Sequence, residues 1–279
     1  FALLVAALLL AGGDFIATLF AVFYNRVWYE RVLRPKYNAA ATPRSAIIVP
    51  VKGVVKNMED NLRAFLAFDY EDYDVLFTVE SEDDESVPVI RRVLDGQPRG
   101  RLVVAGLATT CAQKNHNLLA AIDSEPDAEV YVFADADIGP TTKWLRELIL
   151  PLTDESVVVS TGFRWLRAEQ SGIGAVAHNY INIFIYVLFS TAAFVGEVGL
   201  WGGSMAIRRR DFDRLGIAEL WGQTAVDDMS LSMAVARSGS SAVVVPTAIT
   251  TTDDLIETVN GGMRWFERQI MFLKAYYRR

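Results

Sequence analysis

The sequence predicts an α/β fold with an open, mostly parallel sheet. Short apolar runs such as SAIIVP at 45–50 alternate with helical spacing along the chain. Two of these runs end directly in acidic residues, a pattern that suits parallel sheets, which bind ligands at the carboxyl ends of their strands. Strands are expected at 45–50, 74–79, 101–104, 129–134 and 157–161, and helices at 57–67, 87–94, 115–122 and 142–150.

The length and the charge exclude several classes of protein. The 279 residues suffice for one large domain or two modest ones. A formal net charge of −7 argues against a general nucleic-acid binder, which would carry a basic surplus. The single cysteine, Cys111, excludes an internal disulfide framework and a cysteine-based zinc site. Basic residues gather in 25–44 and 260–279, so an acidic body lies between two basic ends.

The first residues have the composition of a membrane anchor. Residues 1–24 contain one charged side chain, Asp14, and are long enough to cross a bilayer core as a helix. We therefore expect a transmembrane anchor at 1–25 and a basic juxtamembrane linker at 26–44. The basic linker predicts that the rest of the chain lies on the cytoplasmic side. A cleaved signal peptide and a buried core helix are the alternatives.

Carboxylates follow two of the expected strands. The strand at 74–79 leads into the acidic run 80–85, and the strand at 129–134 leads into Asp135 and Asp137. Two carboxylates spaced in this way can reach one Mg²⁺ or Mn²⁺ ion bound to a diphosphate, because these cations prefer oxygen ligands. The alternatives are a solvated acidic loop and a turn whose acids cap a helix.

A second pair of carboxylates, Asp227 and Asp228, stands where a helix is expected to begin. One of them could serve as the general base that deprotonates an acceptor hydroxyl, or Asp227 could cap the helix. Lys114 follows the third strand and could meet a phosphate or lie on the surface. His116 and His178 lack the spacing of a zinc site and are expected to be structural or on the surface.

Two stretches carry a more specific signal. They are Val49-Pro50-Val51-Lys52-Gly53-Val54 and, after Asn61-Leu62, Phe68-Asp69-Tyr70-Glu71-Asp72-Tyr73-Asp74-Val75-Leu76. The chain thereby resembles family 2-type glycosyltransferases with the GT-A fold, and more narrowly the ceramide glucosyltransferases of family 21, over nearly its whole length. The resemblance implies a GT-A domain at 45–259 that uses a UDP-sugar and a divalent cation, Mg²⁺ or Mn²⁺.

The resemblance also implies roles for individual residues. The aspartate near the nucleotide matches Asp84, the aspartate at the metal and diphosphate matches Asp135, and the base matches Asp228. The expected catalytic residues are Asp228 and Asp227, and the expected metal ligands are Asp135 and Asp137. The expected nucleotide-sugar residues are Pro50, Lys52, Gly53, Glu80, Asp83, Asp84, Lys114, Asn117, Asp135, Arg264 and Trp265. The expected acceptor-side residues are Trp201, Gly202, Gly203 and Ser204.

The last motif of the family, (Q/R)-x-x-R-W, is only partly present. Arg264 and Trp265 match it, whereas Gly261 replaces the leading Gln or Arg. This departure leaves the identity of the sugar and of the acceptor open.

Two segments suit a lipid acceptor. The apolar run 173–195 is expected to form a membrane-facing helix or an acceptor wall rather than a second spanning helix. Residues 260–279 alternate aromatic and basic side chains, which predicts an amphipathic helix lying at a membrane interface. A helix packed on the core with a basic face is the alternative.

The expected function is therefore that of a membrane-anchored inverting glycosyltransferase that moves a hexose from a UDP-sugar to a lipid hydroxyl, such as that of ceramide. Alternatives within the enzyme class are a processive polysaccharide synthase, which Gly261 disfavours, and a transferase acting on a hopanoid or diacylglycerol. A membrane-tethered nucleotide-sugar binding module is the non-enzyme alternative. A metal-dependent hydrolase lacks a histidine-rich ligand set, and no nucleic-acid partner is expected.

Overall fold

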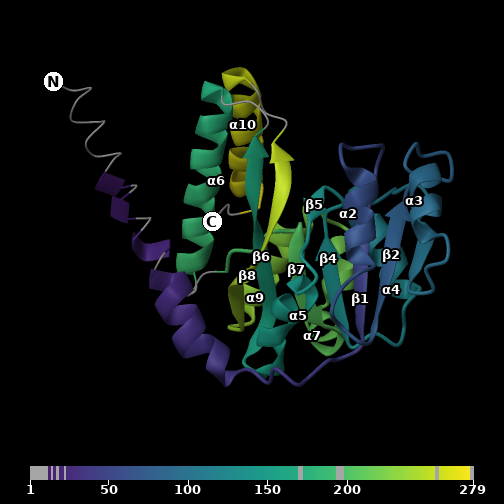
Figure 1. Cartoon of the computed structure of the whole chain (residues 1–279), viewed down its shortest axis with the longest axis horizontal. Coiled ribbons are helices and arrows are strands. Elements are labelled where there is room, and N and C mark those ends of the chain that lie inside the picture. The colour runs from purple at the N-terminus through teal and green to yellow at the C-terminus, as the bar shows by residue number, and fades with distance from the viewer. Residues whose placement is uncertain are drawn as a thin grey trace.

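A computed structural model gives the architecture of the protein (Figure 1) and describes residues 12–13, 15–16, 19–21, 23–168, 172–192, 198–254 and 258–276. The strands are β1 (Ser45–Pro50), β2 (Tyr73–Val79), β3 (Gly100–Val104), β4 (Val130–Ala134), β5 (Ile138–Gly139), β6 (Val157–Ala168), β7 (Ser204–Arg208) and β8 (Ser241–Asp254). The helices are η1 (Tyr24–Leu33), η2 (Arg34–Lys36), α2 (Met58–Phe65), α3 (Val87–Leu94), α4 (Gln113–Asp123), α5 (Trp144–Ile149), η3 (Leu150–Thr153), α6 (Ile173–Ala192), α7 (Arg209–Arg214), α8 (Ile217–Trp221), α9 (Asp227–Arg237) and α10 (Val259–Tyr276).

The eight strands form one sheet in the order β3-β2-β1-β4-β7-β6-β8-β5. The first four of these strands run parallel, as expected from the sequence. β6 and β8 also run parallel to each other, so four of the seven neighbouring strand pairs are parallel and the expectation of a mostly parallel sheet holds in part. β7 runs antiparallel to both β4 and β6, and β5 runs antiparallel to β8, so the sheet is mixed. β7 reverses because it enters the sheet opposite the carboxyl end of β4, where Ser204 pairs with Ala134.

Both faces of the sheet are buried, which explains the continuous apolar character of its strands. Ile47 and Val49 of β1 belong to a core with α2, α3 and α5, whereas Ile48 belongs to a second core with α4, α7, α8 and α9. The alternation follows from the period of two in a strand, which sends successive side chains to opposite faces. The parallel half is therefore a rigid platform with helices on both sides.

The nine elements expected from the sequence are all present, with ends within two residues of the expected ones except at the end of β6. The strands β5, β7 and β8 and the extension of β6 to Ala168 were not expected. Beyond an irregularity after Thr161, β6 continues beside β8 as far as the pair Ala168 and Asp254.

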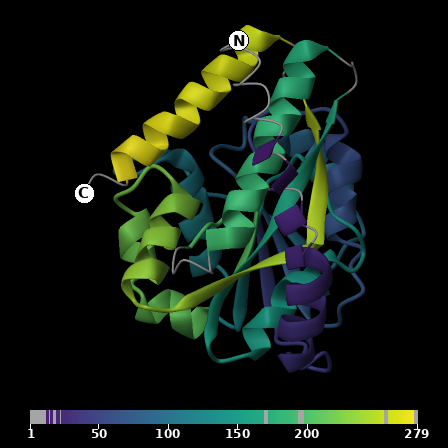
Figure 2. The same cartoon turned by 90° about the vertical axis from the view of Figure 1, so that its left-hand side faces the viewer.

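Helices α6 and α10 lie side by side next to this extension of β6 and β8 (Figures 1 and 2). His178 of α6 and Trp265 of α10 join them, with ring centroids 4.5 Å apart. The outer faces of both helices carry exposed apolar side chains. These are Val176, Tyr180, Ile183, Phe184 and Leu188 on α6, and Met263, Phe266, Ile270 and Met271 on α10.

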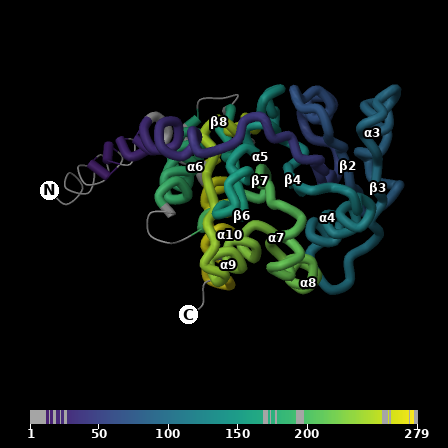
Figure 3. Tube along the Cα trace, turned by 90° about the horizontal axis from the view of Figure 1, so that it is seen from below, coloured from purple at the N-terminus to yellow at the C-terminus, as the bar shows by residue number. Residues whose placement is uncertain are grey.

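The segment before the sheet packs on the domain as helical turns. Figure 3 shows η1 passing beside α6 and β8. The hydroxyl of Tyr24 donates to the carbonyl of Val244 at 2.7 Å, and Arg34 forms an ion pair with Glu147 of α5 at 2.6 Å. Most of the expected anchor at 1–25 lies outside the described residues. Within the described parts of the chain, the structure contains no helix that combines the length and the apolar character needed to cross a membrane.

Candidate active site

Charged side chains from three separate elements meet at the carboxyl edge of the parallel strands. Asp135 directly follows β4, Lys114 lies in the first turn of α4, and Asp227 and Asp228 are the first two residues of α9. We call these four residues the carboxylate cluster. Open α/β sheets bind their ligands at this edge, so the position alone makes the cluster the candidate site.

Lys114 holds the cluster together. Its Nζ lies 2.9 Å from Oδ1 of Asp135 and 3.1 Å from Oδ2 of Asp227, and it donates to the carbonyl of Gly202 at 3.4 Å. Burial lowers the pKa of Lys114, but the carboxylates of Asp135, Asp227 and Asp228 outweigh this effect and hold the pKa above its ordinary value. The ammonium is therefore charged at any physiological pH.

The turn before β7 can approach the cluster only because it is made of glycines. A Cβ on Gly202 would lie 2.7 Å from Oδ2 of Asp227, and one on Gly203 would lie 2.7 Å from Oδ2 of Asp135 and 2.3 Å from the Trp201 ring. Any side chain here would displace a carboxylate or the indole. The expected acceptor-side residues Gly202 and Gly203 thus form one wall of the carboxylate cluster.

Asp228 has the properties of a base. Its Oδ2 accepts a hydrogen bond from the backbone N–H of Gly202 at 2.9 Å. The residue is half-buried, but this bond turns its carboxylate toward the buried turn. Burial and the neighbouring Asp227 carboxylate raise the pKa of Asp228 to about 7, against the opposing influence of Lys114 and of the N–H groups of Gly202 and Met229. A carboxylate with this pKa is suited to accept a proton near neutral pH.

Asp137, two residues beyond Asp135, has an unpaired buried oxygen. Its Oδ1 has no hydrogen-bond partner among the described residues. Burial and the nearby Asp135 carboxylate raise the pKa of Asp137. A buried carboxylate oxygen without a hydrogen-bond partner is suited to bind a cation, because a divalent ion would supply the missing interaction. In the described part of the chain, no group of three or more His, Cys, Asp or Glu side chains could hold a metal by itself. A cation would therefore need oxygen ligands from a substrate as well.

A second set of expected residues meets at the ends of β1 and β2. Gly53, in the left-handed region with φ at 63°, donates its N–H to Oδ1 of Asp84 at 3.0 Å. Burial would raise the pKa of Asp84, but hydrogen bonds from Ser86 and Gly53 outweigh it and lower the pKa. Lys52 is 80% exposed and lies 3.6 Å from Glu80. This set therefore joins the two loops that the resemblance assigns to the nucleotide.

Two other expected nucleotide residues lie nearby in the chain. Pro50 is the last residue of β1 and precedes the loop of Gly53. Asp83 is exposed in the loop between β2 and α3, where its N–H donates to the Ser81 hydroxyl at 3.1 Å.

The other acceptor-side residues are fixed by the core. The hydroxyl of Ser204 accepts from the indole N–H of Trp144 at 3.1 Å, and its carbonyl accepts from the Thr161 hydroxyl at 2.9 Å. The same Thr161 oxygen accepts from the backbone N–H of Trp201 at 3.1 Å. The guanidinium of Arg164 lies 5.4 Å from the centre of the Trp201 ring. These contacts hold the turn rigidly beside the carboxylate cluster.

Three expected residues lie apart from both sets. Asn117 is buried and accepts from the amide of Gln113 at 2.8 Å, so it supports the start of α4. Trp265 packs against His178, and Arg264 is exposed on α10. Their expected contact with the donor stays a prediction.

One supporting residue was missed in the sequence. Asn115 is fully buried, and its amide donates to the carbonyls of Thr224 at 3.0 Å and Trp221 at 3.3 Å. It thereby fixes the segment that leads into Asp227. The available signal was an amide side chain directly beside Lys114 on the inner face of an expected helix. His116, as expected, has a structural contact, since its Nε2 lies 2.9 Å from the carbonyl of Ala105.

The sequence pattern that defines glycosyl transferase family 21 matches residues 13–277, nearly the whole chain. The chain belongs to glycosyl transferase family 21. The resemblance stated from the motifs around Lys52 and Tyr70 is thereby confirmed.

Relatives of this family 21 chain include two ceramide glucosyltransferases. Ceramide glucosyltransferase 1 of Caenorhabditis elegans is 22% identical over 241 residues, which cover 85% of this chain and 52% of the relative. Ceramide glucosyltransferase 3 of the same organism is 20% identical over 217 residues, which cover 74% of this chain and 45% of the relative. The chain spans about half the length of the curated relatives it matches.

Solved glycosyltransferase structures share the fold of the family 21 chain. The mannosyltransferase PcManGT from Pyrobaculum calidifontis, in complex with GDP-Man and Mn²⁺, has a TM-score of 0.64 at 18% identity, covering 96% of this chain and 72% of that one. Glucosyl-3-phosphoglycerate synthase from Mycobacterium tuberculosis, in complex with Mn²⁺, UDP and phosphoglyceric acid, has a TM-score of 0.53 at 14% identity, covering 86% and 81%. The expected GT-A-like α/β fold is confirmed.

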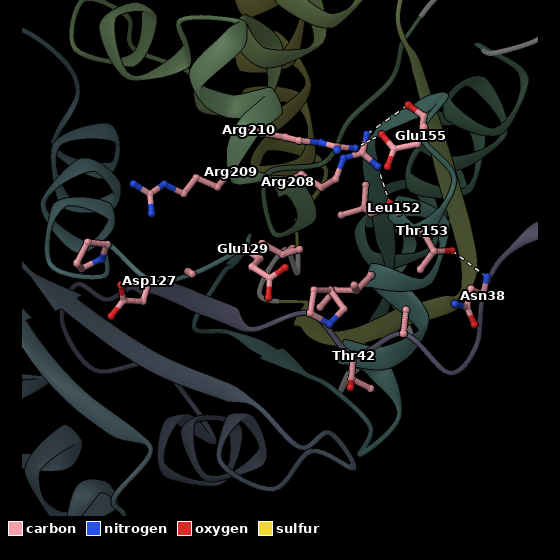
Figure 4. A pocket seen from close by; sticks show the side chains of 16 residues that line it. Asn38, Thr42, Asp127, Glu129, Leu152, Thr153, Glu155, Arg208, Arg209 and Arg210 are labelled. Atoms are coloured by element: carbon pink, nitrogen blue, oxygen red, sulfur yellow. Dashed lines mark hydrogen bonds and ion pairs between the residues drawn. The ribbon is translucent and has the colours of Figure 1, made fainter.

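A cavity of about 850 Å³ in the family 21 chain lies away from the carboxylate cluster (Figure 4). Val130, the first residue of β4, and Arg208, the last residue of the antiparallel β7, line it. It therefore lies at the amino edge of the parallel strands, opposite to Asp135. None of the expected site residues lines it, so it is not the candidate active site.

Proposed function

We propose that the protein is a membrane-associated inverting glycosyltransferase that moves a hexose from a UDP-sugar to a lipid hydroxyl. The observation that carries this proposal is Asp228, a carboxylate that accepts the N–H of Gly202 and has a pKa raised to about 7. Lys114 donates to the carbonyl of the same Gly202. Membership in family 21 supports sugar transfer, and the relatives named ceramide glucosyltransferases support a ceramide-like acceptor.

The donor would span both sets of residues at the carboxyl edge. The loops joined by Gly53 and Asp84 would hold the uridine end, and Lys114 would meet the diphosphate. Asp135 and Asp137 would hold Mg²⁺ or Mn²⁺, and the unpaired Oδ1 of Asp137 fits this role. When bound, the cation would neutralise charge that develops on the leaving diphosphate. Two similar folds carry Mn²⁺ with a nucleotide or nucleotide sugar, which supports this arrangement.

The transfer step follows from the position of Asp228. Its carboxylate takes the proton of the acceptor hydroxyl while the hydroxyl oxygen bonds to the anomeric carbon and the bond from that carbon to the UDP oxygen breaks. UDP leaves on the opposite side, so one displacement inverts the anomeric centre. The Gly202–Gly203 turn, held by Thr161, fixes the base relative to Lys114 and Asp135.

The acceptor would arrive from a bilayer that α6 and α10 touch. Met263, Phe266 and Ile270 repeat at helical spacing on the exposed face of α10, and the exposed residues Arg264 and Arg268 flank them. This pattern suits the surface of an anionic membrane. The basic segment 26–44 supports a catalytic domain on the cytoplasmic side.

Replacing Ile270 by Asp should weaken binding to vesicles of phosphatidylcholine and phosphatidylserine by about tenfold, because it removes an apolar side chain that would enter the bilayer and adds a charge that the anionic lipid repels. Ile270 is 47% exposed in the structure, so the change should leave the fold intact. Co-sedimentation with vesicles measures the effect. The matched control is Leu107→Asp, which changes an exposed apolar side chain on the loop between β3 and α4. Equal loss of binding in both variants would refute the role of α10.

The donor site is tested by calorimetric titration of the purified protein with UDP, UDP-glucose, UDP-galactose and UDP-GlcNAc, each with Mn²⁺ and with EDTA. We expect metal-dependent binding of UDP and of one sugar nucleotide. GDP-mannose is the control for nucleotide specificity. Failure of every uridine nucleotide to bind would overturn the proposed function.

A further inference from the structure

The last described residue of α10 reaches the catalytic end of the domain. The hydroxyl oxygen of Tyr276 accepts hydrogen bonds from the backbone N–H groups of Ala225 at 3.1 Å and Val226 at 3.0 Å. These two residues immediately precede Asp227 and Asp228. A single side-chain oxygen thus ties helix α10 to the chain that carries the proposed base.

The two N–H groups belong to a segment that needs outside support. Val226 is the residue that caps α9, with extended backbone angles, and no side chain caps the helix there. The N–H groups at the start of a helix lack partners within the helix. Tyr276 satisfies the two donors that lie just before its first turn. Without the hydroxyl, only water could do so.

The same segment is pinned on its other side by α4. The amide of Asn115 donates to the carbonyl of Thr224 at 3.0 Å, and the N–H of Ala112 donates to the same oxygen at 3.2 Å. Asn115 is the neighbour of Lys114, so this side is fixed relative to the cluster. Tyr276 supplies the opposing contact, and it comes from a helix none of whose described side chains belongs to either core of the sheet.

We propose that Tyr276 is a positioning residue that sets where Asp228 stands relative to Gly202. Because Tyr276 belongs to α10, the position of this helix then influences the position of the base. The inference rests on the proposed function, in which Asp228 is the base and α10 faces the lipid surface. When the hydroxyl is lost, the start of α9 gains freedom. The carboxylate of Asp228 then spends less time within reach of the Gly202 N–H and of the acceptor.

Tyr276→Phe removes the hydroxyl and retains the ring. We expect kcat for transfer to fall by about tenfold or more, because small misplacements of a reacting group cost that much. The dissociation constant for UDP with Mn²⁺ and the melting temperature should stay close to those of the wild type. The matched control is Tyr131→Phe in β4, which also removes only a phenol hydroxyl, at the edge of the sheet opposite to Asp135. A purely structural role for Tyr276 would lower the melting temperature and would not separate kcat from donor binding.

Amide hydrogen exchange tests the contact independently of catalysis. In Tyr276→Phe the amides of Ala225 and Val226 should exchange about tenfold faster, since each loses a hydrogen bond. If the wild type transfers no sugar, the proposed function fails, whereas faster exchange would still show that Tyr276 holds this segment. If Tyr276→Phe matches Tyr131→Phe in both kcat and amide exchange, the inference is overturned.

Discussion

Replacing Asp228 by Asn should lower kcat for sugar transfer by about 10³-fold while leaving UDP binding intact. General bases typically contribute about 10²–10⁴-fold, and 10³-fold corresponds to about 4 kcal/mol of transition-state stabilisation. The amide oxygen of Asn can still accept the N–H of Gly202, which Asp228 accepts at 2.9 Å, so the turn should keep its position. What is lost is the ability to take a proton. Initial rates with a saturating donor and a titration with UDP measure the two effects separately.

The pH dependence of kcat/KM provides a second test of the role of Asp228. Because the pKa of Asp228 is raised to about 7, the carboxyl is protonated and inactive as a base below that pH. The kcat/KM of the wild type should therefore fall about tenfold per pH unit below pH 7 and level off above it. The residual rate of Asp228→Asn should lack this limb. Asp123→Asn, an exposed carboxylate at the end of α4, is the matched control and should behave as the wild type. An Asp228→Asn variant with more than a tenth of wild-type activity would remove the assignment of the base.

The parallel half of the sheet could be predicted because its evidence is local. A strand such as β4 is one continuous apolar run that ends in Asp135, and burial on both faces demands that composition. β8 could not be predicted in the same way, since it contains Pro246 and several threonines and is stabilised by its pairing with the distant β6. Strand order depends on such long-range pairing, which leaves no periodic signal in the sequence.

The candidate site, too, could be predicted only where its evidence is local in the sequence. The position after an expected strand pointed to Asp135, and the position at the start of an expected helix pointed to Asp228. The structure brings both beside Lys114. The way in which Lys114 links these carboxylates could not be predicted, because the residues are far apart in the chain. The same holds for Tyr276, whose contact with Val226 spans 50 positions. Only the packing of α10 on the domain creates that contact.

Replacing Asp135 by Asn should weaken metal-dependent binding of UDP by at least about a hundredfold, since even changes to the partners of a metal ligand cost about 10–100-fold in affinity. Asp135 is one of two proposed ligands, and Asp137 with its unpaired oxygen is the other. A cation that shares only two carboxylates with the protein depends strongly on each. Calorimetry with UDP and Mn²⁺, repeated in EDTA, measures the loss.

The ion pair of Asp135 with Lys114 at 2.9 Å separates two explanations of that loss. If Asp135 acted only by holding Lys114, binding of UDP in EDTA would fall as much as binding with Mn²⁺, because Lys114 meets the diphosphate in both conditions. If Asp135 holds the cation, the defect should be much larger with Mn²⁺ than in EDTA. Asp127→Asn, an exposed carboxylate in the cavity at the opposite edge of the sheet, is the control and should bind as the wild type. Equal defects in the two conditions would show that the aspartate serves Lys114 and that the cation is held elsewhere.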